Sequence, residues 1–476
     1  MDNSFKRQFV NGTFYIAIAK YAGIVVSIGI TSILSRLLVP SDFGIIAIAT
    51  VFINFFALIT TMGIAPAIIQ NRSLNNEDIK SLYSLTFYLG LIFSLVFILV
   101  TPLIASFYDN EKLKGICFIL SANIFFSVIT IVPNSLLLKA KRFKFIAVRT
   151  VLIQVLMGMI SITYALNGGG VYALLINPVI GSLLIYFVTI RAEKIKLSMF
   201  VGKKSVGKII SFSIYQMLFN IVNLVYRNID KLLIGKCFGM VELGYYEKSY
   251  RLMMLPLENV SNVITPVLHP ILSEYQNDVP FIYSKYKTLV SFLAWIGFPL
   301  SAFLYYSSSE IILLLFGEQW EASIPVFQIL SLSVGLQLVQ SAIGSIYQVT
   351  NQVKKMFVVS FLSMFLILLA VGIGLYYHSL PYMAWCIVSA FFITFVIYHF
   401  VLIKLVLKEN FSLFIKIFLS PLSYTILLVI LYQVLSLSVE IENTFLSLSL
   451  KGGLLLLMIL PLYWITDLKS NIKINS

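Results

Sequence analysis

The chain has 476 residues, of which 59% are hydrophobic and only 11% are charged, and it carries a formal net charge of +14. Its mean hydropathy is +0.95, whereas a water-soluble domain holds about a quarter charged residues. These values exclude a soluble globular domain and predict an integral membrane protein. The first apolar run is too long for a signal peptide and has no cleavage site, so we expect it to be retained.

In chain order, the sequence contains about 14 apolar runs that approach or exceed the ~20 residues needed to cross a bilayer. The runs cover residues 11–38, 43–69, 81–107, 113–138, 144–166, 170–190, 208–235, 243–272, 282–306, 322–349, 355–377, 381–407, 412–436 and 444–467. Glycine, proline and asparagine separate them, as at Pro40 and at residues 167–170. We therefore predict an all-α polytopic membrane protein.

Basic residues are distributed unevenly between the two sides of these runs. Most of the 34 Lys and Arg residues fall in loops on the side of the N-terminus, notably Lys139 to Lys144 with Arg149 and the stretch from Arg191 to Lys208. The opposite loops hold only Lys112, Lys114 and Lys236. This bias predicts that both termini are cytoplasmic, and it explains the positive net charge without nucleic-acid binding.

Two short internal similarities organise the predicted helices. SRLLVPSDFG (Ser35 to Gly44) aligns with DKLLIGKCFG (Asp230 to Gly239), and ASFYDNEKL (Ala105 to Leu113) resembles LLFGEQWEA (Leu314 to Ala322). We expect two pseudo-symmetric six-helix bundles at 1–200 and 205–408, followed by a helix pair and cytoplasmic tail at 409–476. Two bundles of the same orientation can open the space between them to either side in turn, which is typical of a transporter.

Two neighbouring predicted helices carry polar residues at helical spacing. On the run at 208–235 these are Ser213, Gln216, Asn220, Asn223, Arg227, Asp230 and Lys231. On the run at 243–272 they are Glu247, Arg251, Glu258, Asn262, Thr265 and His269. At 100° per residue, each set falls within an arc of about 100° or less. A charge facing lipid near mid-membrane costs at least ~2.5 kcal/mol, so these faces are expected to meet water, ligand or each other.

Structural explanations compete with function for several of these charges. Arg227 with Asp230 and Glu247 with Arg251 have the spacing of neutralising pairs. For three cations near helix ends, snorkelling to the headgroups is at least as well supported as substrate contact: Arg36, Lys231 and Lys248.

The histidines His269 and His399 are more typical of packing than of ligand binding. Arg227 and Lys20 lie deeper in their helices, which favours function for these two.

The stretch from Asn228 to Asp278 resembles the signature of the polysaccharide repeat-unit flippases, the O-antigen and colanic-acid type exporters of the multidrug/oligosaccharidyl-lipid/polysaccharide superfamily. FGEQW (Phe316 to Trp320) and QILSLS (Gln328 to Ser333) agree with it. The resemblance implies two helical bundles in the bacterial inner membrane. It also implies a cargo of undecaprenyl-pyrophosphate-linked oligosaccharide, moved from the cytoplasmic to the periplasmic leaflet. Polymerase and other polysaccharide assembly proteins are the protein partners it suggests.

A cationic cavity would hold the pyrophosphate of such a cargo, and arginine has the planar donor geometry for it. The substrate-binding candidates are Lys20, Asn220, Asn223, Arg227 and Arg251, with the amides and Tyr226 meeting sugar hydroxyls. The coupling or gating candidates are Asp230, Glu247 and Glu258. We expect no cofactor or metal and no catalytic residue, with energy drawn from a proton or sodium gradient or from substrate supply.

Two other functions stay open at the level of the sequence. An ion-coupled multidrug exporter of the same superfamily would favour a carboxylate-rich interior, whereas cations outnumber carboxylates in the predicted helices. A polysaccharide polymerase or other membrane enzyme would need a large catalytic loop or a paired-carboxylate metal motif, and the sequence shows no Asp-x-Asp. The sequence also lacks a GxxxxGK[ST] phosphate-binding loop, which argues against direct ATP hydrolysis.

Overall fold

The computed structural model describes residues 3–61, 64–70, 74–195, 197, 224, 227–438 and 443–459. Every element in these ranges is helical, and no strand occurs among them. Ten of the described helices are long and apolar enough to cross a membrane, or up to 11 if a pair bent by 47° is one span. The predicted all-helical, multi-pass membrane fold is confirmed. The count of about 14 spans stays a prediction, because several expected spans extend beyond the described residues.

The chain divides into two compact units, Met1–Gly244 and Tyr245–Ser476. The boundary predicted at residues 200–205 lies outside the described ranges. The predicted domain limits of 1–200, 205–408 and 409–476 therefore stay predictions, and each unit is described by itself below.

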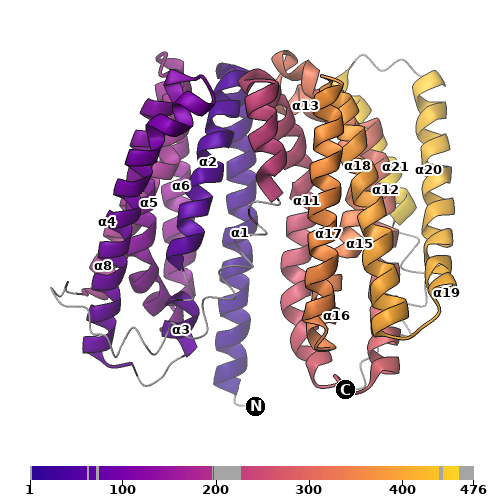
Figure 1. The fold of residues 1–476 in the computed structure, drawn as a ribbon, viewed down its shortest axis with the longest axis horizontal. Helices are drawn as coiled ribbons and strands as arrows, with labels where there is room; N and C mark the ends of the chain where they lie inside the picture. The colour runs from indigo at the N-terminus through magenta and orange to yellow at the C-terminus, as the bar shows by residue number, and fades with distance from the viewer. Residues whose placement is uncertain are drawn as a thin grey trace. The chain divides into compact units, whose positions relative to one another are not determined.

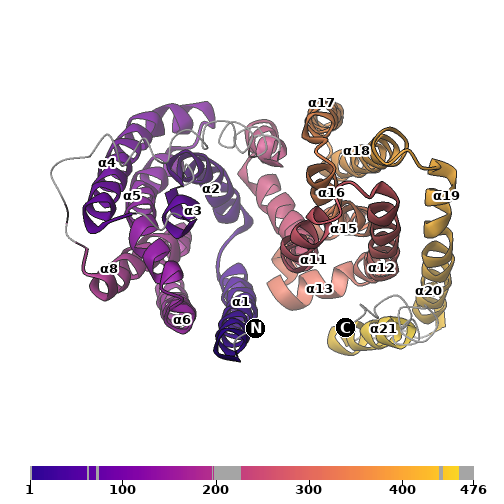
Figure 2. The same ribbon diagram turned by 90° about the horizontal axis from the view of Figure 1, so that it is seen from below.

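The first unit is built around one central helix. Its helices are α1 (Asn3–Leu37), α2 (Pro40–Thr61), α3 (Ile64–Gln70), α4 (Asn76–Phe107), α5 (Glu111–Lys139), α6 (Phe143–Leu166), α7 (Ala173–Ile176) and α8 (Ser182–Glu193). Residues 227–237 are helical as well. Helix α5 packs against α2, α3, α4 and α8, as Figures 1 and 2 show. Its buried residues occur on several sides, as expected of a helix that is enclosed by others.

Polar caps set where the helices of this unit begin. The Asn75 side chain accepts a hydrogen bond from the Asp78 amide at 2.7 Å, and the Asp78 carboxylate accepts one from the Asn75 amide at 3.2 Å. This reciprocal capping box starts α4 five residues before the predicted apolar run at 81–107. At the start of α5, the Asn110 side chain accepts a single hydrogen bond, from the Lys112 amide at 3.1 Å. Apolar periodicity misses such first turns because their residues are polar.

Two glycines allow the first turns of α2 and α11 (Met240–Ser273) to cross at backbone distance. A Cβ atom on Gly44 would lie 1.9 Å from the Met240 carbonyl oxygen, and one on Gly244 would lie 2.1 Å from the Pro40 carbonyl oxygen. Any larger residue at either position must therefore push the backbones apart. SRLLVPSDFG ends at Gly44, in the first turns of α2, and DKLLIGKCFG ends at Gly239, directly before α11. Both aligned segments thus lie at a junction between helices, and the pseudo-symmetric repeat stays a prediction.

The second unit contains the rest of α11 and the C-terminal helices. These are α12 (Val279–Tyr306), α13 (Ser308–Phe316), α14 (Ile324–Ser331), α15 (Val334–Gln340), α16 (Ile343–Val349), α17 (Val353–Tyr376), α18 (Leu380–Phe400), α19 (Phe411–Ile415), α20 (Leu419–Ser438) and α21 (Thr444–Ile459). Helix α12 packs against α14, α15 and α20, and α17 forms a hairpin with α18 (Figure 2).

The run predicted at 322–349 is bent rather than straight. Its two parts, Glu318–Ser331 and Val334–Val349, meet at 47°. Beyond the bend, the Gly335 amide donates a hydrogen bond to Ser301 Oγ of α12 at 2.8 Å. A Cβ atom on Gly297 of α12 would lie 2.9 Å from the Gly335 Cα atom. This contact between two glycines brings α15 directly against α12.

Candidate functional site

One face of α11 carries three of the predicted site residues. Because α11 is a continuous helix of 34 residues, Glu247, Arg251 and Glu258 lie on the same side of it, as their spacing predicted. The side chains of Arg251 and Glu258 are exposed, and that of Glu247 is half-buried. All three belong to the second unit. An exposed arginine on a long helix of a membrane protein is available to an anionic ligand.

Lys248, next to this face, does not snorkel, and that prediction was wrong. Its side chain is only 3% exposed. The ammonium group lies 4.6 Å from the ring centre of Phe316 and 5.0 Å from that of Trp320. The aromatic rings hold the charge by cation–π attraction, which is strongest where water is excluded. The FGEQW segment, quoted above for its family resemblance, therefore encloses a buried cation. The two aromatic residues of FGEQW were the feature of the sequence that could have predicted a cation–π contact here.

In the first unit, Arg227 and Asp230 occupy one helix at a spacing of three residues. Asp230 is 6% exposed, and its carboxylate accepts a hydrogen bond from the Lys231 amide at 2.8 Å. Arg227 is exposed. Within the described part of the chain, no ion pair joins Arg227 to Asp230, whose carboxylate has other partners. Both roles weighed for Arg227, neutralising Asp230 and binding a ligand, stay predictions.

The remaining candidates are placed only in part. Lys20 lies on α1 with a half-buried side chain. Asn220, Asn223 and Tyr226 lie outside the described residues, as do the side chains of Asn262, Thr265 and His269 on α11. The structure thus assigns Lys20, Arg227 and Asp230 to one unit and Glu247, Arg251 and Glu258 to the other. Whether they form one site stays a prediction.

Other polar residues within helices are structural. His399 is 1% exposed and packs among Phe395, Phe414 and Tyr286, with Nδ1 located 2.8 Å from the Phe395 carbonyl oxygen. This environment agrees with the packing role predicted for it. Among the described residues, no group of three or more His, Cys, Asp or Glu side chains has the arrangement of a metal site.

A buried ion pair joins two helices of the second unit. Lys451 of α21 donates to the carboxylate of Glu310 on α13 and also to the Tyr306 carbonyl oxygen, the latter at 2.7 Å. Ser447 Oγ donates to the same carboxylate at 2.7 Å. Both charged side chains are 13% exposed. Glu310 lies between the predicted runs at 282–306 and 322–349, where apolar periodicity gives no sign of a helix or of an ion pair.

Arg149 is a further residue that the sequence analysis misplaced. It was counted with the basic loop that precedes the run at 144–166, but it lies within α6 and is 8% exposed. Its guanidinium donates to Thr189 Oγ1 on α8 and, at 3.1 Å, to Asn134 Oδ1 on α5. A basic residue two turns into a helix cannot be distinguished by composition from one in the loop before it.

Comparisons with known proteins agree with these features. The family described as "Polysaccharide biosynthesis protein" matches residues 33–325. The lipopolysaccharide biosynthesis protein WzxC of Escherichia coli (strain K12) is 25% identical over 381 residues, covering 78% of this chain and 76% of WzxC.

Solved structures of transporters share the fold. A structure titled "Lipid II flippase MurJ, inward closed conformation" superposes with a TM-score of 0.72 at 16% identity, covering 94% of this chain and 98% of the other. A multidrug resistance MATE family transporter in an inward-facing conformation gives a TM-score of 0.57 at 15% identity, covering 79% of this chain and 92% of the other. Because the family match extends over more than half of the sequence, the chain belongs to the polysaccharide biosynthesis protein family.

Proposed function

We propose that the chain is a flippase for lipid-linked oligosaccharides. It moves undecaprenyl-pyrophosphate-linked repeat units from the cytoplasmic to the periplasmic leaflet of a bacterial inner membrane by alternating access, with both of its own termini in the cytoplasm. The product serves the synthesis of a surface polysaccharide or lipopolysaccharide. Family membership, the relative named for lipopolysaccharide biosynthesis and the fold shared with a lipid II flippase support this proposal.

The observation that carries the proposal is the exposure of Arg227 and Arg251 on helices of a membrane protein in this family. A pyrophosphate brings two negative charges that hydrocarbon does not solvate, so a translocation path must supply hydrogen-bond donors and positive charge. Arginine offers both and keeps its charge in a dry environment. Polar neighbours such as Asn220 and Asn223 would contact the sugar hydroxyls, while the polyprenyl tail stays in lipid.

The alternative is an ion-coupled multidrug exporter, which the fold shared with a MATE family transporter favours. The two functions differ in the charge of the transported molecule. The arginines suit an anionic pyrophosphate, whereas an organic cation would be repelled by them and would be bound by carboxylates.

Reconstitution into proteoliposomes separates these functions. The probe is undecaprenyl-pyrophosphate-linked oligosaccharide extracted from the source cells, and the readout is its accessibility to an impermeant sugar-oxidising reagent. We expect the protein to bring the probe to equilibrium between leaflets much faster than protein-free vesicles do. Flipping at the protein-free rate, together with gradient-driven uptake of an organic cation, would contradict the proposal in favour of drug export.

A further inference from the structure

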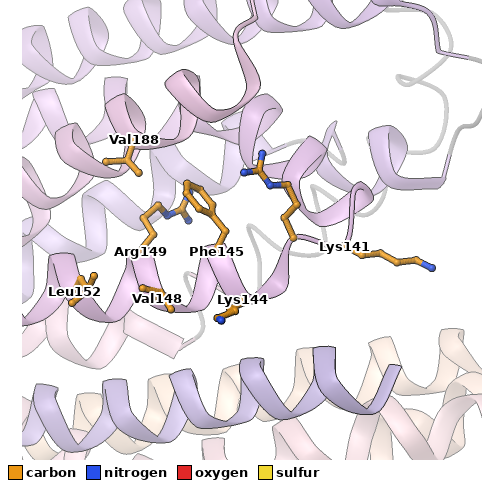
Figure 3. Close-up of a pocket in the computed structure, with 8 residues that line it drawn as sticks. Lys141, Lys144, Phe145, Val148, Arg149, Leu152 and Val188 are labelled. Atoms are coloured by element: carbon orange, nitrogen blue, oxygen red, sulfur yellow. The ribbon is translucent and has the colours of Figure 1, made fainter. Parts of the chain in front are cut away.

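A basic cavity of about 610 Å³ lies in the first unit, beside the first turns of α6 (Figure 3). Two kinds of side chain line it. The basic ones are Lys141, Arg142, Lys144 and Arg149, and the apolar ones are Phe145, Val148, Leu152 and Val188. All come from α6, from the turn before it and from α8. None is among the residues assigned above to cargo binding.

Arg149 supplies a buried charge to this cavity that its protein contacts do not neutralise. Its two hydrogen-bond partners, Thr189 and Asn134, are neutral. Within the described residues, no carboxylate forms an ion pair with Arg149, and its buried Nε atom has no hydrogen-bond partner. Figure 3 shows Arg149 among the side chains that line the cavity. A buried cation in such surroundings is stabilised by an anion that supplies both charge and an acceptor.

Arg142 adds a second guanidinium group on the same side of α6. It lies over the Phe145 ring at 5.0 Å from the ring centre, and its Nη1 atom is 3.4 Å from the Glu193 carboxylate. Glu193 therefore neutralises part of the charge at the rim, whereas Arg149 remains farther inside. Lys141 and Lys144 are the other two basic side chains of the lining.

The apolar side of the cavity continues along an exposed apolar surface of α6. Val148 and Leu152 are exposed, and Leu156, one turn further on, is exposed as well. A lipid whose phosphate binds Arg149 would therefore have an apolar surface beside it for an acyl chain. Basic pockets between membrane helices on the cytoplasmic side commonly bind the headgroups of anionic lipids. The positive-inside bias puts this end of α6 on that side.

We infer that the α6–α8 cavity binds the phosphate of an anionic glycerophospholipid of the cytoplasmic leaflet. The phosphate oxygens accept hydrogen bonds from Arg149 and from the basic residues at the start of α6. One acyl chain lies along Val148 and Leu152. This site is separate from the proposed flipping of the cargo, and lipid binding is measured without transport.

The test is native mass spectrometry of the full-length protein in a neutral detergent. Phosphatidylglycerol is titrated against phosphatidylethanolamine with the same acyl chains, and the affinity of the first bound lipid is compared. We expect a preference for phosphatidylglycerol that Arg149→Gln lowers by about fivefold or more, the effect of one nearby charge. Val148→Trp, which fills the cavity from its exposed side, should lower it similarly. Leu156→Trp, on the same exposed face but outside the cavity, should leave it unchanged.

Several outcomes would overturn the inference. Equal binding of the two lipids, or an unchanged preference in Val148→Trp, would mean that the cavity does not select the lipid. Displacement of phosphatidylglycerol by inorganic phosphate at equal concentration would identify a soluble anion as the ligand. Preferential displacement by undecaprenyl phosphate would identify the cargo carrier instead. If Arg149→Gln does not fold, Lys144→Gln together with Val148→Trp provides the same comparison.

Discussion

Two sets of charged side chains in the second unit differ in their burial and in their hydrogen bonds. Glu310 and Lys451 face each other between α13 and α21, are 13% exposed, and have additional hydrogen bonds from Ser447 and to the Tyr306 carbonyl oxygen. Arg251 and Glu258 are exposed on one face of α11. A charge within a helix of a membrane protein is therefore not by itself a sign of a binding site. Exposure and the number of satisfied donors and acceptors separate a structural charge from a candidate functional one.

The largest stability effect should come from breaking the structural pair. Lys451→Ala leaves the Glu310 carboxylate buried without its countercharge, and we expect a loss of about 3 kcal/mol in the free energy of unfolding. Unfolding of the detergent-solubilised protein measures it. The matched control is Lys80→Ala, which breaks the exposed Lys80–Glu77 pair at 2.8 Å and should cost about 0.5 kcal/mol or less. Equal losses in the two variants would remove the distinction between buried and exposed pairs.

Lys248 is an intermediate case, since it is buried like Lys451 but lies beside the candidate face of α11. Removing its charge and stem in Lys248→Ala should cost about 2 kcal/mol, through loss of the cation–π contacts with Phe316 and Trp320. The same unfolding experiment checks this value. Lys248→Arg should recover most of it, because a guanidinium also binds aromatic faces. A loss as small as that of Lys80→Ala would show that the aromatic contacts contribute little.

Arg251 is expected to show the opposite pattern, with little effect on folding and a large one on transport. Arg251→Ala should change the free energy of unfolding by no more than about 0.5 kcal/mol, as is usual for exposed positions. A charged hydrogen bond to pyrophosphate is worth about 1.5–3 kcal/mol, so flipping at limiting cargo should fall by roughly tenfold to a hundredfold. Proteoliposome flipping and unfolding are measured on the same preparation. Normal flipping would remove Arg251 from the site.

Glu258 should have the smallest effect on stability and a specific effect on energy coupling. If Glu258 couples flipping to a pH gradient, Glu258→Gln should abolish the gradient dependence, because an amide cannot replace a carboxylate in that role. The protein should still reach the membrane in normal amounts. Glu274→Gln, an exposed carboxylate beyond the end of α11, is the matched control. Unchanged gradient dependence in Glu258→Gln would reject the coupling role.

The sequence predicts where the helices of this chain lie better than it predicts which helices pack against each other. The runs at 113–138 and 355–377 match α5 and α17 to within two residues, because length, hydropathy and breakers are local properties. The close contact of α15 with α12 could not be predicted, since it joins Gly297 and Gly335, which are distant in sequence.

The same limit applies to the charges. Helical spacing correctly placed Glu247, Arg251 and Glu258 on one face of α11. Spacing could not show that Lys248 is enclosed by residues from the FGEQW segment, or that Arg149 turns inward toward α5 and α8. The burial of a charged side chain and its hydrogen-bond partners depend on the packed structure. They decide which of the predicted charged residues remain candidates for ligand binding.

The central claim is that exposed arginine side chains bind the pyrophosphate of a lipid-linked cargo, and Arg227 tests it most directly. The measurement is the flipping rate in proteoliposomes of Arg227→Ala, Arg227→Lys and Arg227→Ala/Asp230→Ala at matched protein amounts. We expect Arg227→Ala to lose flipping and Arg227→Lys to recover only part of it, because an ammonium lacks the planar two-pronged donor geometry. The double variant should stay inactive. Recovery of flipping in the double variant would contradict the account, because it would mean that Arg227 serves only to balance the charge of Asp230.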